Sequence, residues 1–204
     1  LRTGIVGSGF SATFHYEALA RVYGVNVEVV GVHTVAIDQG RAFAATRGIR
    51  FFDALEPLLD SVDVVHVCVP PMFHEPISIA GLARDKFVVC EKPLTGYFGE
   101  PDTPKDALVG KMNKREMLGK VIARCDEVVD AIKTSGIKFG YAENWVYAPS
   151  FVKLWRLAEV AKGTIIRIEA EESHSGSHAE YAKQWRLSGG GSLMVKGSHP
   201  LGAA

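Results

Sequence analysis

Apolar runs alternate with amphipathic stretches along most of this chain. Predicted strands cover residues 3–6, 25–32, 50–52, 62–69, 87–90 and 137–141, and helical patterns lie between them at 10–20, 39–47, 54–59, 72–83 and 114–134. The runs 25–32 and 62–69 are continuous and rich in β-branched residues, as expected of strands buried on both faces. Strand and helix therefore alternate regularly, which predicts an α/β fold with a doubly wound parallel sheet.

The first predicted strand ends in a glycine turn that opens directly into a helix. The turn reads Gly7-Ser8-Gly9-Phe10-Ser11-Ala12. In such a turn the first glycine permits the tight bend, the second lets the backbone approach a pyrophosphate, and the small third residue lets helix and strand pack closely. The free N–H groups of the helix start favour phosphate charge. We therefore predict a Rossmann-type dinucleotide-binding fold in which these six residues hold the cofactor.

The end of the second predicted strand bears on the choice between NAD and NADP. An acidic residue there accepts a hydrogen bond from the ribose of NAD, and an arginine suits the phosphate of NADP. This chain has His33 and Thr34 at that place, so the sequence predicts NAD or NADP without a preference. Asp38 lies a few residues on and offers an alternative acid, although an N-cap for the next helix is the simpler interpretation.

Further cofactor contacts are expected where the other strands end, because ligands of open parallel sheets bind at the carboxyl edge. The strand at 62–69 stops at two prolines, and a histidine follows them. The strand at 87–90 runs into Glu91-Lys92-Pro93, and an asparagine lies just beyond the strand at 137–141. The residues assigned to the cofactor on this basis are Val69, Pro70, Pro71, His74, Glu91, Lys92 and Asn144.

Composition narrows the classes of protein that fit. Hydrophobic residues make up 47% of the 204 positions, which is enough for a core, and the formal net charge is zero, which argues against nucleic acid or an anionic membrane as partner. No apolar stretch has the length of a membrane span. The three cysteines are odd in number and form no metal motif, which favours a cytoplasmic location.

The regular alternation of strand and helix ends near residue 147, and the residues after it suggest a second domain. We place the dinucleotide-binding domain at residues 1–147, and residues 148–204 as the start of an incomplete α+β domain for substrate or oligomer contacts. A helix at 149–161 and an alternating strand at 164–171 are expected there. The polar stretch that follows holds His174 and His178, for which substrate contact, a solvated loop and, least of all, a metal site stay open. The segment 96–113 has the composition of a surface loop, a lid or an oligomer contact.

Several motifs in order resemble the Gfo/Idh/MocA family of oxidoreductases. They are the glycine turn, the two prolines followed by His74, Glu91-Lys92-Pro93-Leu94, Asn144 with Pro149, Trp185-Arg186, the triple glycine at 189–191 and Gly197-x-His199. The resemblance covers nearly the whole chain. It implies an NAD(P)-dependent dehydrogenase of sugars or cyclic polyols, with a cis peptide bond at Lys92-Pro93.

The resemblance also implies site residues. Lys92 corresponds to the family lysine that contacts substrate and cofactor near the transferred hydride, and His199 to the second catalytic residue. The family's aspartate four residues before that histidine is replaced here by Val195, so we expect His199 to lack an orienting carboxylate on a helix that starts near Gly191. The substrate-binding set is Lys92, His174, His178, Trp185, Arg186, Lys196 and His199.

Three functions stay open at this stage. The first is a sugar or polyol dehydrogenase that forms a homodimer or homotetramer through the second-domain sheet. The second is redox-assisted glycoside hydrolysis with tightly held NAD, and the third is a nucleotide-binding regulatory protein with a degraded site, which Val195 makes conceivable. Fold does not decide among them.

Overall fold

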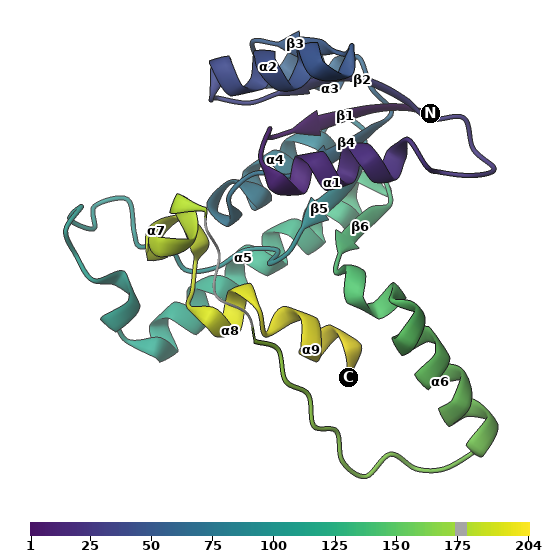
Figure 1. The fold of residues 1–204 in the computed structure, drawn as a ribbon. Coiled ribbons are helices and arrows are strands. Elements are labelled where there is room, and N and C mark those ends of the chain that lie inside the picture. Colours follow the sequence, from purple (N-terminus) through teal and green to yellow (C-terminus); the bar gives the residue numbers. More distant parts are fainter. Residues whose placement is uncertain (174–178) are drawn as a thin grey trace.

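A computed structural model describes residues 1–173 and 179–204 of the chain. In that part, six parallel strands form one sheet in the order β3-β2-β1-β4-β5-β6 (Figure 1). The strands are β1 (Arg2–Val6), β2 (Glu28–His33), β3 (Arg50–Phe52), β4 (Val64–Val67), β5 (Phe87–Glu91) and β6 (Phe139–Ala142). This order reverses direction between β1 and β4, which places the ligand crevice there. The predicted doubly wound α/β fold is confirmed.

Helices up to Ser135 cover both faces of the sheet, and the later helices follow β6 in the chain. The helices are α1 (Phe10–Leu19), α2 (Ile37–Arg47), α3 (Leu55–Asp60), α4 (His74–Leu82), α5 (Lys114–Ser135), α6 (Pro149–Ala161), α7 (Trp185–Ser188), α8 (Ser192–Val195) and α9 (Ser198–Ala203). Short 3-10 turns lie at η1 (Pro71–Phe73), η2 (Val109–Lys111), η3 (Asn144–Tyr147) and η4 (Glu180–Lys183).

Two apolar clusters fix these layers. On one face, Ile5 and Val32 of the sheet pack with Ala12 of α1 and Phe43 of α2. On the other face, side chains of β4 and β5 pack with α3, α4 and α5. Successive residues of β4 therefore point to opposite faces, so His66, between the buried Val65 and Val67, points toward α1.

The segment 96–113 is only in part the surface loop that its composition predicted: most of residues 101–113 are exposed, but its two ends contribute to a core. Tyr97, Phe98 and Val109 are buried, and Tyr97 and Val109 form a small core with Met117 of α5. Trp185 packs against this core and donates from Nε1 to the carbonyl oxygen of Tyr97 at 3.0 Å. Aromatic residues spaced within a Gly- and Pro-rich stretch supplied enough apolar area for a core, which the turn-forming composition concealed.

The strand predicted at 164–171 is not formed in the described part of the chain. The helix before it, α6, is present and extends away from the sheet, and residues 164–173 run beyond it without a partner strand (Figure 1). An alternating pattern specifies which face of a strand is apolar but supplies no partner for its backbone groups. The division of the chain at residue 147 stays a prediction.

The prediction of a single helix from Gly191 through His199 is also wrong. Two short helices, α8 and α9, replace it, with a break at Lys196 and Gly197. Pro200 has no N–H to donate to Lys196, and the backbone N–H of His199 donates to that carbonyl oxygen at 3.1 Å instead. The break places Val195 and His199 in different helices.

Candidate functional site

The glycine turn has the backbone that a phosphate cradle needs. Gly7 has a φ of +112°, and a Cβ there would lie 2.2 Å from the carbonyl oxygen of Cys68, so only glycine fits. A Cβ on Gly9 would meet nothing within 4 Å, which leaves open space beside the backbone. Ala12 is fully buried against the sheet. Gly7 thus forms the tight turn and Ala12 packs against the sheet, as their spacing predicted, while the phosphate contact at Gly9 stays a prediction.

The start of α1 offers unpaired donors to this space. No side chain caps the helix, and the first hydrogen bond of the turn runs from the Thr13 N–H to the carbonyl oxygen of Gly9. Phe10, Ser11 and Ala12 therefore present N–H groups with no acceptor inside the helix. Such donors at the positive end of a helix dipole fit a pyrophosphate, and Ser8 lies in the same turn, half-buried.

At the end of β2, both predicted ribose contacts have protein partners. His33 donates from Nδ1 to the carbonyl oxygen of Phe52 at 3.0 Å, and the Thr34 hydroxyl accepts from the N–H of Ala36 at 3.3 Å. Asp38 is not an N-cap: it lies in the first turn of α2, whose N-cap is Ala36. Neither a carboxylate nor a guanidinium ends β2 itself.

His74 lies between two strand ends rather than toward open space. Its ring is 1% exposed, Nδ1 lies 2.7 Å from the carbonyl oxygen of Pro93, and Nε2 lies 2.8 Å from that of Val69. Burial lowers the pKa of His74, although the two carbonyl oxygens oppose that shift. The histidine therefore joins the segment after β4 to the segment after β5. Pro70 and Pro71 follow Val69 and continue the chain through η1 into α4.

A partly buried histidine pair that the sequence pattern did not reveal joins α1 to β4. Nδ1 of His15 in α1 lies 2.7 Å from Nδ1 of His66 in β4, and Nε2 of His15 lies 3.1 Å from Oε1 of Glu91. Burial, with a smaller effect of His15, lowers the pKa of His66 to about 3. A histidine inside an otherwise apolar strand run was the signal in the sequence.

Glu91 is held as an ionised carboxylate by its neighbours. Burial alone raises the pKa of this carboxyl, but the hydrogen bond and charge of His15 and the N–H and charge of Lys92 outweigh burial and lower it. Its second oxygen accepts from the N–H of Lys92 at 3.0 Å. Glu91 thus fixes the backbone from which the Lys92 side chain leaves β5.

Lys92 reaches across to the C-terminal segment. Its Nζ donates to the carbonyl oxygen of Val195 at the end of α8, at 3.0 Å. The peptide bond between Lys92 and Pro93 is cis, as the resemblance implied. The lysine therefore lies at the carboxyl edge of the sheet, next to the stretch that ends in His199.

His199 has a carboxylate partner, contrary to expectation. Its Nδ1 lies 2.7 Å from Oε1 and 2.8 Å from Oε2 of Glu143, which follows β6 and is 5% exposed. Val195 supplies no carboxylate, and the carboxylate beside His199 comes from Glu143 in another element. The signal in the sequence was an acidic residue at a strand end, directly before Asn144, which the motif comparison did not consider.

Six predicted site residues remain, and the structure describes four of them. Asn144 is exposed at the start of η3, and Lys196 is half-buried at the break between α8 and α9. Arg186 donates to the carbonyl oxygens of Thr103 and Pro104, so its head group, like the indole of Trp185, is engaged by the segment 96–113. His174 and His178 lie outside the described residues.

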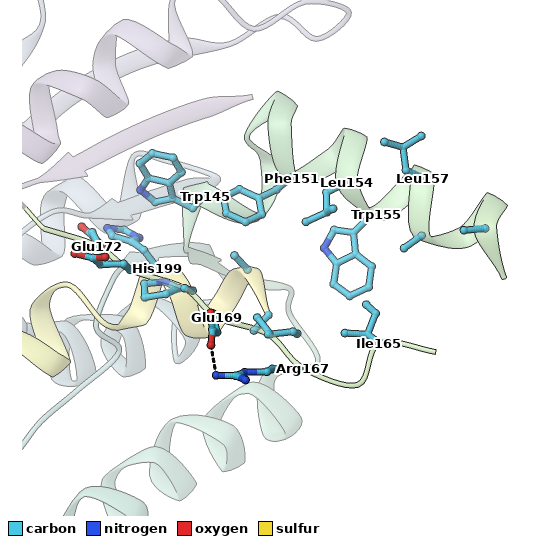
Figure 2. A pocket seen from close by; sticks show the side chains of 18 residues that line it. Trp145, Phe151, Leu154, Trp155, Leu157, Ile165, Arg167, Glu169, Glu172 and His199 are labelled. Carbon is cyan, nitrogen blue, oxygen red and sulfur yellow. Dashed lines mark ion pairs between the residues drawn. The ribbon is translucent and has the colours of Figure 1, made fainter. Parts of the chain in front are cut away.

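An apolar cavity of about 700 Å³ has His199 among its lining residues. Figure 2 shows His199 and Trp145 near one end and Trp155 and Ile165 toward the other, with the side chains of α6 along one wall. An ion pair between Arg167 and Glu169 lies on the opposite wall (Figure 2). The lining of the cavity does not include Lys92 or the glycine turn. An apolar wall offers a polyol few partners for its hydroxyl groups.

Thiol and metal chemistry find little support in the described residues. Burial raises the pKa of the Cys90 thiol to about 12 and that of Cys68 well above its ordinary value, so both stay protonated. In the two described ranges, His, Cys, Asp and Glu side chains form no group of three or more that could hold a metal ion. Over the same residues, no helix is both long and apolar enough to cross a membrane.

Known dehydrogenases of sugars and polyols are similar in sequence to this chain. Curated relatives include glucose-6-phosphate 3-dehydrogenase of Bacillus subtilis, 30% identical over 105 residues, and inositol 2-dehydrogenase of Corynebacterium glutamicum, 36% identical over 103 residues. These alignments cover 52% and 47% of this chain but 29% of each relative. The chain therefore aligns with less than a third of the length of these two relatives.

Solved structures match over a longer range. GenD2 from gentamicin A biosynthesis, in complex with NAD, is 25% identical with a TM-score of 0.77 over 100% of this chain and 52% of its own. An NAD-binding protein from Listeria innocua, 22% identical with a TM-score of 0.70 over 99% of this chain and 53% of its own, shares the fold. Residues 1–115 match the model of the oxidoreductase family with an NAD-binding Rossmann fold. With its glycine turn and its Glu91-Lys92-Pro93 strand end, this chain belongs to the Gfo/Idh/MocA family of oxidoreductases.

Proposed function

We propose that this protein takes part in NAD(P)-dependent oxidation or reduction of a sugar or cyclic polyol. The observation that carries the proposal is the meeting of Lys92 and the segment Val195 to His199 at the carboxyl edge of the sheet. The two relatives, a glucose-6-phosphate dehydrogenase and an inositol dehydrogenase, support the substrate class, since both compounds are rings with secondary hydroxyl groups.

The cofactor fits the residues that are present. The N–H groups of Phe10, Ser11 and Ala12 would hold the pyrophosphate beside Gly9, and the exposed Asn144 would lie toward the nicotinamide side. When bound, a nicotinamide accepts a hydride from the carbon that bears the reacting hydroxyl group. The protein's own task is then to bind that hydroxyl group and to remove its proton.

Two side chains suit this task. Nε2 of His199 would accept the hydroxyl proton, because Nδ1 already donates to Glu143. The Lys92 ammonium would donate to the same oxygen and stabilise negative charge on it as the proton leaves. In the reverse direction His199 returns the proton to the oxygen of the carbonyl group.

The finer features of the proposal are these. We propose NAD or NADP as the cofactor, a homo-oligomer as the working form and a cytoplasmic location, the last because Cys68, Cys90 and Cys125 are free thiols. A regulatory protein with a degraded site is the weaker alternative, since Glu143 supplies the carboxylate that Val195 does not.

The test is net reduction of NAD or NADP by the protein with a panel of inositols, sugar phosphates and sugar nucleotides, followed by nicotinamide absorbance. Reduction with one compound class supports the proposal. Consumption of a glycoside without net reduction favours redox-assisted hydrolysis. Cofactor binding by calorimetry without either reaction overturns the dehydrogenase proposal in favour of the regulatory one.

A further inference from the structure

The contact between Glu143 and His199 is short, involves both carboxylate oxygens and is largely buried. Both carboxylate oxygens lie within 2.8 Å of Nδ1, and the side chains are 6% and 13% exposed. The carboxylate is itself fixed, because Oε1 also accepts from the N–H of Trp145 at 3.1 Å. A charge-assisted hydrogen bond in such a setting is stronger than one between neutral groups.

Helix α9 is shaped to receive this carboxylate. Gly202 lies one turn after His199, and a Cβ at that position would lie 2.7 Å from Cγ of Glu143. The Trp145 ring meets the imidazole edge to face, with centroids 6.1 Å apart. Carboxylate, glycine and indole thus define one position for the imidazole ring.

We propose that Glu143 is a positioning residue that fixes the orientation of His199 and keeps its proton on Nδ1, leaving Nε2 as the basic atom. The inference rests on the proposed function for its kinetic consequences. A carboxylate oxygen accepts, so Nδ1 must donate, and the described residues offer Nε2 no hydrogen-bond partner.

The same geometry explains why position 195 can be a valine. The backbone carbonyl of Val195 holds Lys92, and its side chain is not needed for His199. Glu143 reaches the histidine from the end of β6, 56 residues earlier in the chain. A carboxylate at position 195 and one at position 143 are therefore alternative ways to orient one imidazole ring.

The direct test is nitrogen NMR of the histidine ring in protein labelled with 15N-histidine, with the His199 signals assigned from their loss in His199→Asn. We expect the Nδ1–H tautomer in the protein as it is. Free histidine favours Nε2–H, so Glu143→Leu should move His199 toward that form, whereas Glu143→Gln, whose amide oxygen still accepts, should keep Nδ1–H. An Nε2–H ring in the unmodified protein, or an unchanged ring in Glu143→Leu, overturns the proposal.

Kinetics give the second readout. Glu143→Leu should lower kcat by about 10- to 100-fold with a smaller effect on KM, the range for lost partners of a functional histidine, and Glu143→Gln should lose less. Gly202→Ala should lower kcat by displacing the carboxylate even if Glu143→Leu fails to fold. Leu201→Ala, an exposed neighbour in α9, is the matched control and should have no effect.

The two proposals can fail separately. If the tautomer changes as expected but no dinucleotide-dependent reaction is found, the dehydrogenase function fails and the positioning of His199 stands. If the protein turns over and Glu143→Leu keeps full kcat, the function stands and the role of Glu143 is overturned.

Discussion

Nε2 of His15 lies 3.1 Å from Oε1 of Glu91, which joins the helix that follows the glycine turn to the strand that presents Lys92. The two residues are 76 positions apart in the chain. The same imidazole contacts His66 on its other side. The helix after the glycine turn and the strand end before Lys92 are therefore connected through one partly buried polar cluster.

We predict that His15→Ala destabilises the protein by about 1–3 kcal/mol, because it leaves Glu91 and His66 without their partner in a poorly solvated place. Urea unfolding measures the change. The control is Glu17→Ala in the same helix, whose exposed pair with Arg21 should contribute less than about 0.5 kcal/mol. Equal stability of the two variants would show that the cluster adds nothing to folding.

We predict that Gly9→Val abolishes cofactor binding without unfolding the protein. The added Cβ would meet no protein atom within 4 Å, and the side chain would fill the space that the pyrophosphate needs. Calorimetry with NAD and NADP measures the loss. Gly119→Val, in α5 with equally open surroundings, should keep the affinity of the original chain. Unchanged binding by Gly9→Val would place the cofactor elsewhere.

Discrimination between NAD and NADP should be weak. The end of β2 has His33 and Thr34, both bonded to the protein backbone, with neither a carboxylate nor a guanidinium. The two dissociation constants should differ by about tenfold or less, which is about 1.4 kcal/mol. A thousandfold preference in titration calorimetry would mean that another residue, such as Asp38, reads the ribose.

Lys92→Ala and His199→Ala should each lower kcat by about 10² or more on the true substrate, the loss expected when a general acid or base is removed. Steady-state kinetics with the compound identified in the substrate panel provides the measurement. Lys133→Ala, which removes an exposed lysine at the end of α5, is the control and should retain kcat. Full activity in both site variants would remove Lys92 and His199 from the reaction.

Acid should destabilise the protein through His66. The pKa of this side chain is about 3 in the folded chain against 6.5 as its ordinary value, so the unfolded chain binds more protons below pH 6.5. Stability is therefore complete above pH 6.5 and falls as the pH decreases toward 3, by at most about 1.4 kcal/mol per pH unit. Urea unfolding between about pH 7 and about pH 5 should show a shallower decline for His66→Val. Parallel declines for the two proteins would contradict the assignment.

The sequence predicted most of the sheet because parallel strands buried on both faces are continuous apolar runs, which can be recognised locally. It also predicted the tight turn at Gly7 and the packing of Ala12, since a turn between strand and helix constrains backbone over only a few residues. The prediction of a strand at 164–171 was wrong for the opposite reason. Strand formation depends on a partner, and the pattern of one segment does not contain its partner.

By itself, the sequence determined the doubly wound order of elements, the glycine turn between β1 and α1 and the strand end that precedes Lys92. Only the tertiary structure decided which carboxylate contacts His199, which partner holds Lys92 and how His15 and His66 come together. These contacts join residues 56, 103 and 51 positions apart. Spacing along a chain determines which side chains share a face of one element, whereas packing and the break before His199 determine which side chains of different elements meet.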